Sequence, residues 1–412
     1  MENRRKFLKK ALSFAAGSFI VDKAFPKINF TQRDYNIIEN QKEISNPYGI
    51  SSDKVKWMKK ATLKQLKGCR VKGAGGTWIH TPDGVGNYKA LWTRDSYYMV
   101  EYAGDLMTPE DIKASIYYLI NGQREDGCIP DRVNSEGLPV YSPGAPGNPL
   151  ADHAVDNGPF MAMMVCSYVN QYDDEKLFKA LEQKLLKGIE FVRVKENGLV
   201  YNKPENPECV YGFTDIVKKT GYLLFSSLLY FKANLEMYKL CQKFGHGNAN
   251  KYRRRYEYVR QSIYRLWDEE TGMFWAADED CKQIDIWGSA YAVDVGITSD
   301  DQTKRITRYL VNHYDDIVRK GQIKHLPGKD EVWQKLFVPC EAGTYQNGAY
   351  WATPLSWMIP VFAKHDKKLA KKMLETVIED FQENDINECI NEDYVKVPNF
   401  VVSATNVYAL TR

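Results

Sequence analysis

"RDSYYMVEYAGDLMTPEDIKASIYYLING", residues 94–122, is the stretch that decides the fold. Apolar residues recur in it at helical spacing on both sides of a short break. In the break, Thr108 suits a helix N-cap and Pro109 suits the first helical position. The stretch therefore predicts two helices joined by a short link.

The rest of the chain repeats this arrangement of paired helices. Apolar spacing and capping residues predict about twelve helical segments, near 52–68, 94–105, 109–122, 154–172, 175–193, 216–244, 249–267, 287–296, 301–317, 348–363, 366–382 and 402–411. Long loops rich in Gly and Pro separate the pairs, at 69–92, 123–152, 194–214, 268–286, 318–347 and 383–401. Loops of this length inside a compact domain are usually functional.

Six helix pairs and six long loops predict an all-α fold, an (α/α)6 toroid of six helical hairpins with its long loops on one face. Alternate helices would form the inner ring, and the face with the loops would hold the site. A solenoid of stacked pairs is the alternative, and it should show a repeat of fixed period. The toroid would span 51–412 as one catalytic domain, after an extended linker at 31–50.

The composition is that of an ordinary globular chain with many aromatic residues. The net charge of +3 over 412 residues gives no reason to expect a nucleic-acid partner. The chain has 27 Tyr, 17 Phe and 9 Trp, many of them in polar segments that contain Gly. Aromatic residues in such segments are typical of interfaces or of platforms for flat apolar faces such as those of sugar rings.

Residues 1–30 predict an export signal. "NRRKFLK" at 3–9 resembles the twin-arginine motif, with Arg4 and Arg5 ahead of an apolar segment at 11–21. The apolar segment is too short to indicate a transmembrane helix. We expect an exported protein, periplasmic or envelope-associated, without a stable membrane span once the signal is removed; a basic amphipathic helix is the alternative.

Polar and aromatic residues gather in the long loops and at the helix starts beside them. Carboxylates and amides can bind sugar hydroxyl groups, and aromatic rings can stack on sugar C–H faces. Repeated clusters of this kind predict a carbohydrate site. The candidate substrate-binding residues are Trp92, Arg94, Asp95, Asp156, Asn157, Glu208, Trp287, Glu341, Gln346, Asn347 and Trp351, with Trp333 as a further stacking candidate.

Five segments occur in the order in which similar segments occur in the six-hairpin glycosidases, a clan that includes trehalase and the processing α-glucosidases. "WTRDSYY" at 92–98 resembles the segment at the first inner helix of that clan, and "DNGPF" at 156–160 is similar to the segment that follows it. "PECVYGFTD" at 207–215 resembles the segment that ends in the general acid. "YQNGAYW" at 345–351 and "VSATNVY" at 402–408 are similar to the two late segments. The resemblance implies an inverting glycoside hydrolase acting on an α-linked oligosaccharide, with no cofactor and no metal.

The resemblance implies that Asp215 is the general acid. Tyr211 and Phe213 flank it and would make a partly dry pocket, which favours the protonated carboxyl. Asp215 also stands at the start of the predicted helix 216–244, so a role as the N-cap of that helix is the alternative. Glu208 is the rival for the acid.

The general base is less well defined. Glu392 and Glu388 compete for this role, with Glu341 third, and Glu392 is favoured because it lies closer to "SATN" at 403–406. A plain surface loop is the alternative for this acidic stretch.

Two other classes of function stay open. A sugar epimerase or polysaccharide lyase on the same fold would use His or Tyr as proton carriers, and His80 and His153 lie in suitable loops. A glycan-binding protein without catalysis would keep the aromatic residues and need no carboxylate pair. The six histidines show no zinc-binding spacing.

Overall fold

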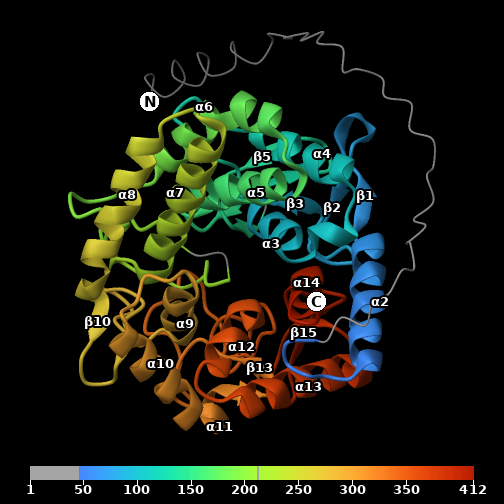
Figure 1. Ribbon diagram of the computed structural model, residues 1–412, viewed down its shortest axis with the longest axis vertical. Helices are drawn as coiled ribbons and strands as arrows, with labels where there is room; N and C mark the ends of the chain where they lie inside the picture. The colour runs from blue at the N-terminus through green and yellow to red at the C-terminus, as the bar shows by residue number, and fades with distance from the viewer. Residues whose placement is uncertain (1–45, 146, 211–212) are drawn as a thin grey trace, which may run out of the picture. The chain divides into compact units, whose positions relative to one another are not determined.

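The computed structural model describes residues 46–145, 147–210 and 213–412; the predicted export signal at 1–30 and most of the predicted linker lie outside them. The described residues contain thirteen α-helices, α2–α14, and seven small antiparallel sheets, the largest of three strands (Figure 1). Each of the twelve predicted helical segments overlaps an observed helix. The predicted predominance of helices is therefore confirmed.

Six helices are buried along most of their length and supply much of the core. They are α3 (Thr93–Ala103), α5 (Asn157–Tyr172), α7 (Leu224–Phe244), α9 (Ile286–Asp294), α12 (Leu355–Ala363) and α14 (Val401–Ala409). They contact one another in the order α3, α5, α7, α9, α12 and α14, and α14 contacts α3 again. A helix that is apolar on all sides needs such neighbours, because it has no face suited to water.

Six further helices each present one buried face to this set. They are α2 (Ser52–Gly68), α4 (Pro109–Ile120), α6 (Glu175–Phe191), α8 (Ala249–Ser262), α10 (Asp300–Asn312) and α13 (Lys367–Asn384), and the short α11 (Tyr314–Ile317) follows α10. Helix α2 packs on α14, both α4 and α6 pack on α5, and α8 packs on α7. Helix α10 packs on α9, and α13 packs on α12. Thr108 caps α4 and Ser299 caps α10, as their positions before Pro109 and Asp300 lead one to expect.

Two of the buried helices begin later than the sequence predicts. α7 begins at Leu224 rather than 216, and α12 begins at Leu355 rather than 348. The residues before them form turns and isolated bridges instead, in which Val217 pairs with Leu336 and Tyr350 pairs with Ile390. Asp215 is therefore not an N-cap, and the prediction that it stands at a helix start is wrong.

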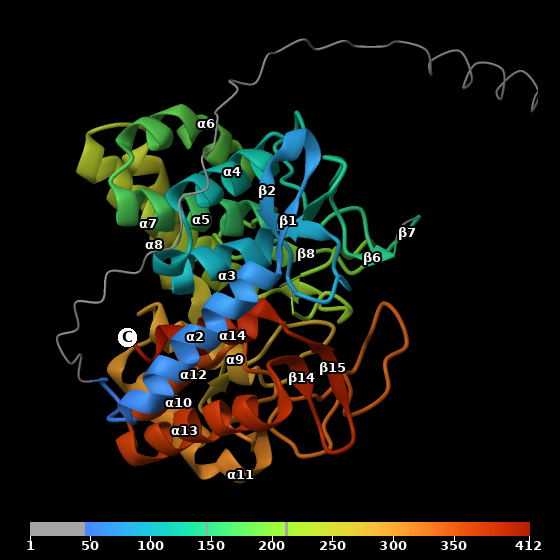
Figure 2. The ribbon, with the colours of Figure 1, turned by 90° about the vertical axis from the view of Figure 1, so that its right-hand side faces the viewer.

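The strands are short and belong to the loops. They are β1 (Arg70–Lys72), β2 (Trp78–His80), β3 (Ala90–Trp92), β4 (Arg132–Asn134), β5 (Pro139–Val140), β6 (Gly144–Ala145), β7 (Asn148–Pro149), β8 (Tyr201–Asn202), β9 (Gly221–Tyr222), β10 (Trp267–Asp268), β11 (Met273–Phe274), β12 (Val318–Arg319), β13 (Gln322–Ile323), β14 (Asn387–Ile390) and β15 (Val395–Pro398). Figure 2 shows β1, β2, β6, β7, β14 and β15 along one side of the helices. This is the side on which the loops that build the pocket described below are found.

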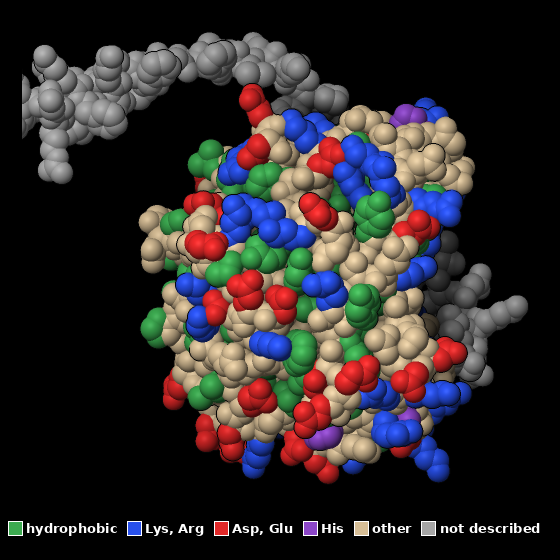
Figure 3. All heavy atoms as spheres, turned by 90° about the vertical axis from the view of Figure 1, so that its left-hand side faces the viewer, with side chains coloured by type: hydrophobic (Ala, Val, Ile, Leu, Met, Phe, Trp, Pro, Cys, Tyr) green, Lys and Arg blue, Asp and Glu red, His purple; other side chains and the backbone are tan. Residues whose placement is uncertain are grey.

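The face around α8 carries charges of both signs, with Lys and Arg interspersed among Asp and Glu (Figure 3). On α8, Arg255 pairs with Glu190, and Arg253 pairs with Glu257. A mixed surface of this kind fits the small net charge of the chain. No helix within the described ranges is long and apolar enough to cross a membrane.

Candidate active site

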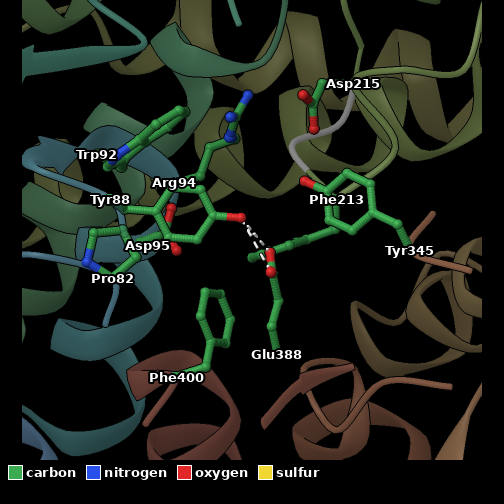
Figure 4. A pocket seen from close by; sticks show the side chains of 10 residues that line it. All are labelled: Pro82, Tyr88, Trp92, Arg94, Asp95, Phe213, Asp215, Tyr345, Glu388 and Phe400. Atoms are coloured by element: carbon green, nitrogen blue, oxygen red, sulfur yellow. Dashed lines mark hydrogen bonds between the residues drawn. The ribbon is translucent and has the colours of Figure 1, made fainter. Parts of the chain in front are cut away.

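A small pocket of about 40 Å³ lies where loops from distant parts of the chain meet (Figure 4). It combines three acidic side chains, one arginine and a group of aromatic rings. Its lining residues are Pro82, Tyr88, Trp92, Arg94, Asp95, Phe213, Asp215, Tyr345, Glu388 and Phe400. Because these residues come from loops and from the starts of α3 and α14, the sheets and turns described below decide where each side chain points.

Tyr88 is presented by a turn that closes around the buried carboxylate of Asp83. The two carboxylate oxygens of Asp83 accept hydrogen bonds from the backbone N–H groups of Val85, Asn87 and Tyr88 at 2.9, 3.0 and 2.7 Å. A carboxylate that collects several N–H donors fixes the turn around it. The Tyr88 hydroxyl then donates to both oxygens of Glu388 (Figure 4).

Glu388 lies on β14 and is only 2% exposed. Burial raises the pKa of its carboxyl to about 8, while the positive charge of Lys396 and the hydrogen bond from Tyr88 oppose the rise. Lys396 stands on β15, opposite Cys389 in the hairpin, with its Nζ 3.0 Å from the centre of the Tyr345 ring. The carboxyl thus sits in a dry environment with one cation near enough to favour its ionised form.

Asp215 enters the pocket from the loop between β8 and β9. Its Oδ1 accepts a hydrogen bond of 2.7 Å from Nε2 of Gln346. Burial raises the pKa of its carboxyl, and the nearby Arg94 guanidinium and the Gln346 hydrogen bond oppose the rise. Of the two aromatic residues expected beside it, Phe213 lines the pocket, and Tyr211 lies outside the described residues.

A buried network of charges supports Arg94 and Asp95 at the start of α3. Arg94 lies 3.0 Å from Asp131 and 4.0 Å from Asp156, and Arg132 lies 2.7 Å from Asp131. Burial raises the pKa of Asp95 to about 7 and that of Asp156 to about 6, while Arg94 opposes both rises. Arg94 therefore reaches the pocket from a rigid buried base.

Several predicted substrate-binding residues lie next to the pocket and hold its loops. Asp156 and Asn157 are buried at the start of α5, on the far side of Arg94. Glu208 accepts hydrogen bonds from the backbone N–H groups of Asp152 and His153 at 3.0 and 3.1 Å. These contacts join two neighbouring loops, so the structure places Glu208 in loop packing and not on the pocket wall.

Gln346 and Asn347 likewise bind protein groups. Gln346 contacts Asp215, as described above, and is fully buried. Asn347 accepts a hydrogen bond from the backbone N–H of Trp333 and donates one to the carbonyl of Cys340. Both amides thus hold the loop at 340–347 in its shape.

The two other candidates for the base do not line the pocket. Glu392 is exposed and pairs with Arg319 at 2.9 Å. Glu341 is exposed as well. Of the three carboxylates considered for this role, the structure brings Glu388 alone together with Asp215 in the described pocket.

The four tryptophans proposed as stacking residues divide into one pocket residue and three core residues. Trp92 lines the pocket, with the Arg132 guanidinium 4.5 Å from its ring centre. Trp287, Trp333 and Trp351 are 0%, 4% and 0% exposed, so packing accounts for all three. Trp287 stacks on His325 with ring centres 3.6 Å apart.

Neither histidine that the sequence singled out lines the pocket. Burial lowers the pKa of His80 and of His153 to about 4, which leaves both rings neutral near pH 7. His153 lies 3.5 Å from Glu208. Within the described ranges, no group of three or more His, Cys, Asp or Glu side chains is arranged to hold a metal ion.

The sequence did not single out four of the lining residues, Pro82, Tyr88, Tyr345 and Phe400. Tyr88 and Tyr345 stand in the polar aromatic segments that suggested a sugar site, so that pattern contained a signal for them. Phe400 immediately precedes α14 and meets Tyr88 edge to face at 6.3 Å. An apolar residue before a helix carries no distinguishing sequence signal.

The chain matches no protein-family model and no curated protein. It does resemble solved structures of glycoside hydrolases. The GH63 mannosylglycerate hydrolase from Thermus thermophilus in complex with glucose aligns with a TM-score of 0.64 at 15% identity, over 86% of this chain and 100% of that one. A rhamnosidase from Klebsiella oxytoca with rhamnose bound aligns with a TM-score of 0.64 at 12% identity, over 89% of this chain and 64% of that one.

A GH78 rhamnosidase of Bacillus sp. GL1 aligns with a TM-score of 0.58 at 13% identity, over 87% of this chain and 34% of that one. The chain therefore spans only part of the two rhamnosidases but the full length of the mannosylglycerate hydrolase. At these identities the likeness concerns the fold. The fold of this chain is that of glycoside hydrolases, as the resemblance to six-hairpin glycosidases predicted.

Proposed function

We propose that the chain is an inverting glycoside hydrolase that cleaves an α-linked oligosaccharide on an (α/α)6 toroid. One observation carries the proposal: Asp215 and Glu388, far apart in the sequence, line the same small pocket together with Arg94, Asp95 and aromatic rings. The closed series of contacts among α3, α5, α7, α9, α12 and α14 supports the toroid, with the remaining long helices outside it.

Inverting hydrolysis needs one carboxyl that protonates the leaving oxygen and a second carboxylate that activates water on the opposite face of the sugar. In this proposal Asp215 is the acid and Glu388 is the base. Asp95 and Arg94 bind hydroxyl groups of the sugar, and the rings of Trp92, Tyr88 and Phe400 cover its apolar faces. No cofactor takes part in this scheme.

The acid–base states of the two carboxyls need one further argument. Burial raises the pKa of both groups, and that of Glu388 reaches about 8, so Glu388 resists the ionised state that a base requires. The charge of Asp215 contributes to the rise at Glu388, so the two groups titrate as an interacting pair. Between the two macroscopic pKa values the pair holds one proton, and the productive state places that proton on Asp215.

The high pKa of Glu388 also favours the exchanged assignment, in which Glu388 is the acid and Asp215 the base. Leaving-group dependence separates the two assignments, because an activated leaving group needs no protonation. Asp215→Asn should retain hydrolysis of a glycosyl fluoride while losing hydrolysis of an unactivated glycoside. Glu388→Gln should lose both. The reverse pattern, in which Glu388→Gln retains hydrolysis of the fluoride and Asp215→Asn loses it, would make Glu388 the acid and Asp215 the base.

The function itself is tested by hydrolysis. Purified protein would be assayed on α-glucosides, α-mannosides, α-rhamnosides and trehalose, and ¹H NMR would follow the anomer released first. We include mannosides and rhamnosides because the structural neighbours are named for mannosylglycerate and rhamnose. Release of the inverted anomer, abolished in Asp215→Asn and Glu388→Gln, supports the proposal. Full activity in both variants would refute the mechanism.

A further inference from the structure

The contact between Gln346 and Asp215 leads to a more specific conclusion about how the pocket handles its proton. Gln346 is 0% exposed, and its Nε2 donates to Oδ1 of Asp215 at 2.7 Å. Such a short bond from a fully buried amide is a fixed contact, because Gln346 cannot exchange it for water. The inference rests on the proposed function, since it concerns the carboxyl assigned there as the acid.

The orientation of the Gln346 amide is determined by its second partner. Its Oε1 accepts a hydrogen bond of 2.9 Å from the backbone N–H of Ile216. A backbone N–H can only donate, so the oxygen of the amide must face Ile216 and the nitrogen must face Asp215. Flipping the amide would break both bonds, and one side chain therefore binds two successive residues of the Asp215 loop.

The backbone around Gln346 is held as tightly as its side chain. The carbonyl of Gln346 accepts a hydrogen bond from Nε1 of Trp333 at 3.0 Å. Phe337 donates its backbone N–H to the carbonyl of Ile216, which ties the neighbouring loop to the same place. Tyr345, immediately before Gln346, has φ +40°, a conformation that costs energy for a residue with a side chain and persists where the surroundings enforce it.

We propose that Gln346 is a positioning residue that keeps Oδ1 of Asp215 engaged as an acceptor, so that Oδ2 carries the proton delivered to the substrate. A protonated carboxyl has one O–H group, and Oδ1 already faces an N–H donor. The strained turn at Tyr345 directs the tyrosine ring into the pocket and the next side chain, Gln346, toward Asp215. One turn thus forms part of the pocket wall and fixes the acid.

The same contact affects the pH at which Asp215 loses its proton. Arg94 and the Gln346 bond stabilise the ionised form, and Asp131 destabilises it. Asp95, Asp156, Glu388, Tyr345, Cys209 and Lys219 also interact with the Asp215 charge. All of these groups other than Gln346 remain when Gln346 alone is changed, so a difference between variants isolates its effect.

The experiment compares Gln346→Met, which keeps the length and removes the donor, with Gln346→Glu, which keeps the shape and adds a carboxyl. We expect kcat to fall about 10–100-fold in Gln346→Met with little change in KM, because the acid is misplaced while the sugar still binds. The pKa of Asp215, and with it the limb of the pH profile that Asp215 sets, should move upward by about one unit when a hydrogen bond to the carboxylate is lost. It should move further in Gln346→Glu, because two facing carboxyls share one proton.

Gln322 offers a matched control. It is also 0% exposed and donates through Nε2 to an aspartate, Asp380, at 2.9 Å, outside the pocket lining. Gln322→Met should lower thermal stability without moving either limb of the pH profile. If Gln346→Met merely lowered stability as this control does, with an unmoved limb, the positioning role would be refuted.

A substrate-free measurement separates this inference from the proposed function. Protein labelled with ¹³C at the Asp carboxyls would be titrated by NMR, with Asp215→Asn to assign the Asp215 signal. The Asp215 pKa should rise from wild type to Gln346→Met to Gln346→Glu. If no glycoside is hydrolysed but this order holds, the proposed function fails and Gln346 still sets the proton position. An Asp215 titration that is the same in all three proteins would overturn the inference.

Discussion

The hydroxyl of Tyr88 lies 2.9 Å from Oε1 and 3.0 Å from Oε2 of Glu388, so one donor faces both oxygens of a buried carboxyl. Tyr88 precedes α3, whereas Glu388 lies between α13 and α14. The contact therefore joins the first and last of the pocket-forming loops. A donor so placed stabilises the carboxylate form, because an ionised carboxyl attracts an O–H group more strongly than a neutral one.

Tyr88→Phe should lower kcat/KM near pH 6. The hydrogen bond from Tyr88 lowers the pKa of Glu388, so its loss raises that pKa further above its present value of about 8. If Glu388 must be ionised, a rise of about one unit in its pKa reduces the active fraction of the enzyme at pH 6 by about 10-fold. The lost activity is recovered at higher pH, where Glu388 ionises in both proteins. Kinetics between pH 5 and pH 10 would measure the shift.

Tyr118→Phe is the control for the lost hydroxyl. The Tyr118 hydroxyl also donates to an oxygen, the carbonyl of Asn134, at 2.7 Å, and Tyr118 is not a pocket-lining residue. This variant should keep the wild-type profile. An unchanged kcat/KM at pH 6 in Tyr88→Phe would show that the protonation state of Glu388 does not limit the rate.

Glu388→Gln should stabilise the fold at neutral and alkaline pH. The folded pKa of about 8 lies above the ordinary value of 4.5, so the contribution of this carboxyl to stability is fully present below pH 4.5 and is lost as pH rises through 8. The amide of the variant does not ionise, so the variant does not lose stability as the pH rises. We expect equal melting temperatures near pH 4 and an advantage of about 2–5 kcal/mol for the variant above pH 8.

The exposed Glu392 provides a comparison for that measurement. Glu392→Gln removes a carboxylate whose side chain is 69% exposed in its pair with Arg319, and such pairs contribute little. Its melting temperature should stay near that of the wild type from pH 4 to pH 9. A Glu388→Gln variant with the same flat behaviour would contradict the raised pKa of the buried Glu388 carboxyl.

Arg94→Met should destabilise the protein strongly. Arg94 is 4% exposed at its side chain, and Asp131 beside it is 0% exposed. Removing one partner of a buried ion pair leaves an uncompensated charge and costs about 3–5 kcal/mol. Urea unfolding would measure the loss, and Arg253→Met on α8, which breaks an exposed pair with Glu257, should leave unfolding unchanged.

We propose that residues 1–30 direct export, and the paired arginines allow a direct test. Changing Arg4 and Arg5 together to Lys preserves the charge and removes the guanidinium groups that twin-arginine signals require. Cell fractionation should then find the variant in the cytoplasm, whereas the wild type should be found in the periplasm or the envelope fraction. Equal distribution of both proteins would exclude this route of export.

The sequence predicted the helices well because their signals are local. Apolar spacing and caps such as Thr108 depend on neighbours within a few turns, and each predicted segment overlaps a helix. The starts of α7 and α12 were predicted too early, because pairing of Val217 with Leu336 and of Tyr350 with Ile390 involves residues distant in sequence. Apolar spacing contains no information about such partners.

The site residues also divide into those recognised from local sequence and those whose position depends on residues distant in sequence. Arg94, Asp95 and Asp215 stood in segments that could be recognised by order and type, and all three line the pocket. Nearness to "SATN" favoured Glu392 over Glu388, but Glu388 lies on the buried strand β14, whereas Glu392 lies in the exposed turn between β14 and β15. The sequence could not supply that difference, because it depends on how the hairpin packs against Tyr88 and Tyr345, which are distant in sequence.

The contact of α14 with α3 has a consequence for how the protein is made. Glu388 reaches Tyr88 only when β14, β15 and the following α14 have packed against the first helices. During translation, the early loops leave the ribosome long before the strand that completes their pocket. A nascent or prematurely terminated chain that lacks 387–409 would therefore contain Tyr88, Trp92 and Asp215 but neither Glu388 nor Phe400, and the pocket would be complete only after synthesis has passed this segment.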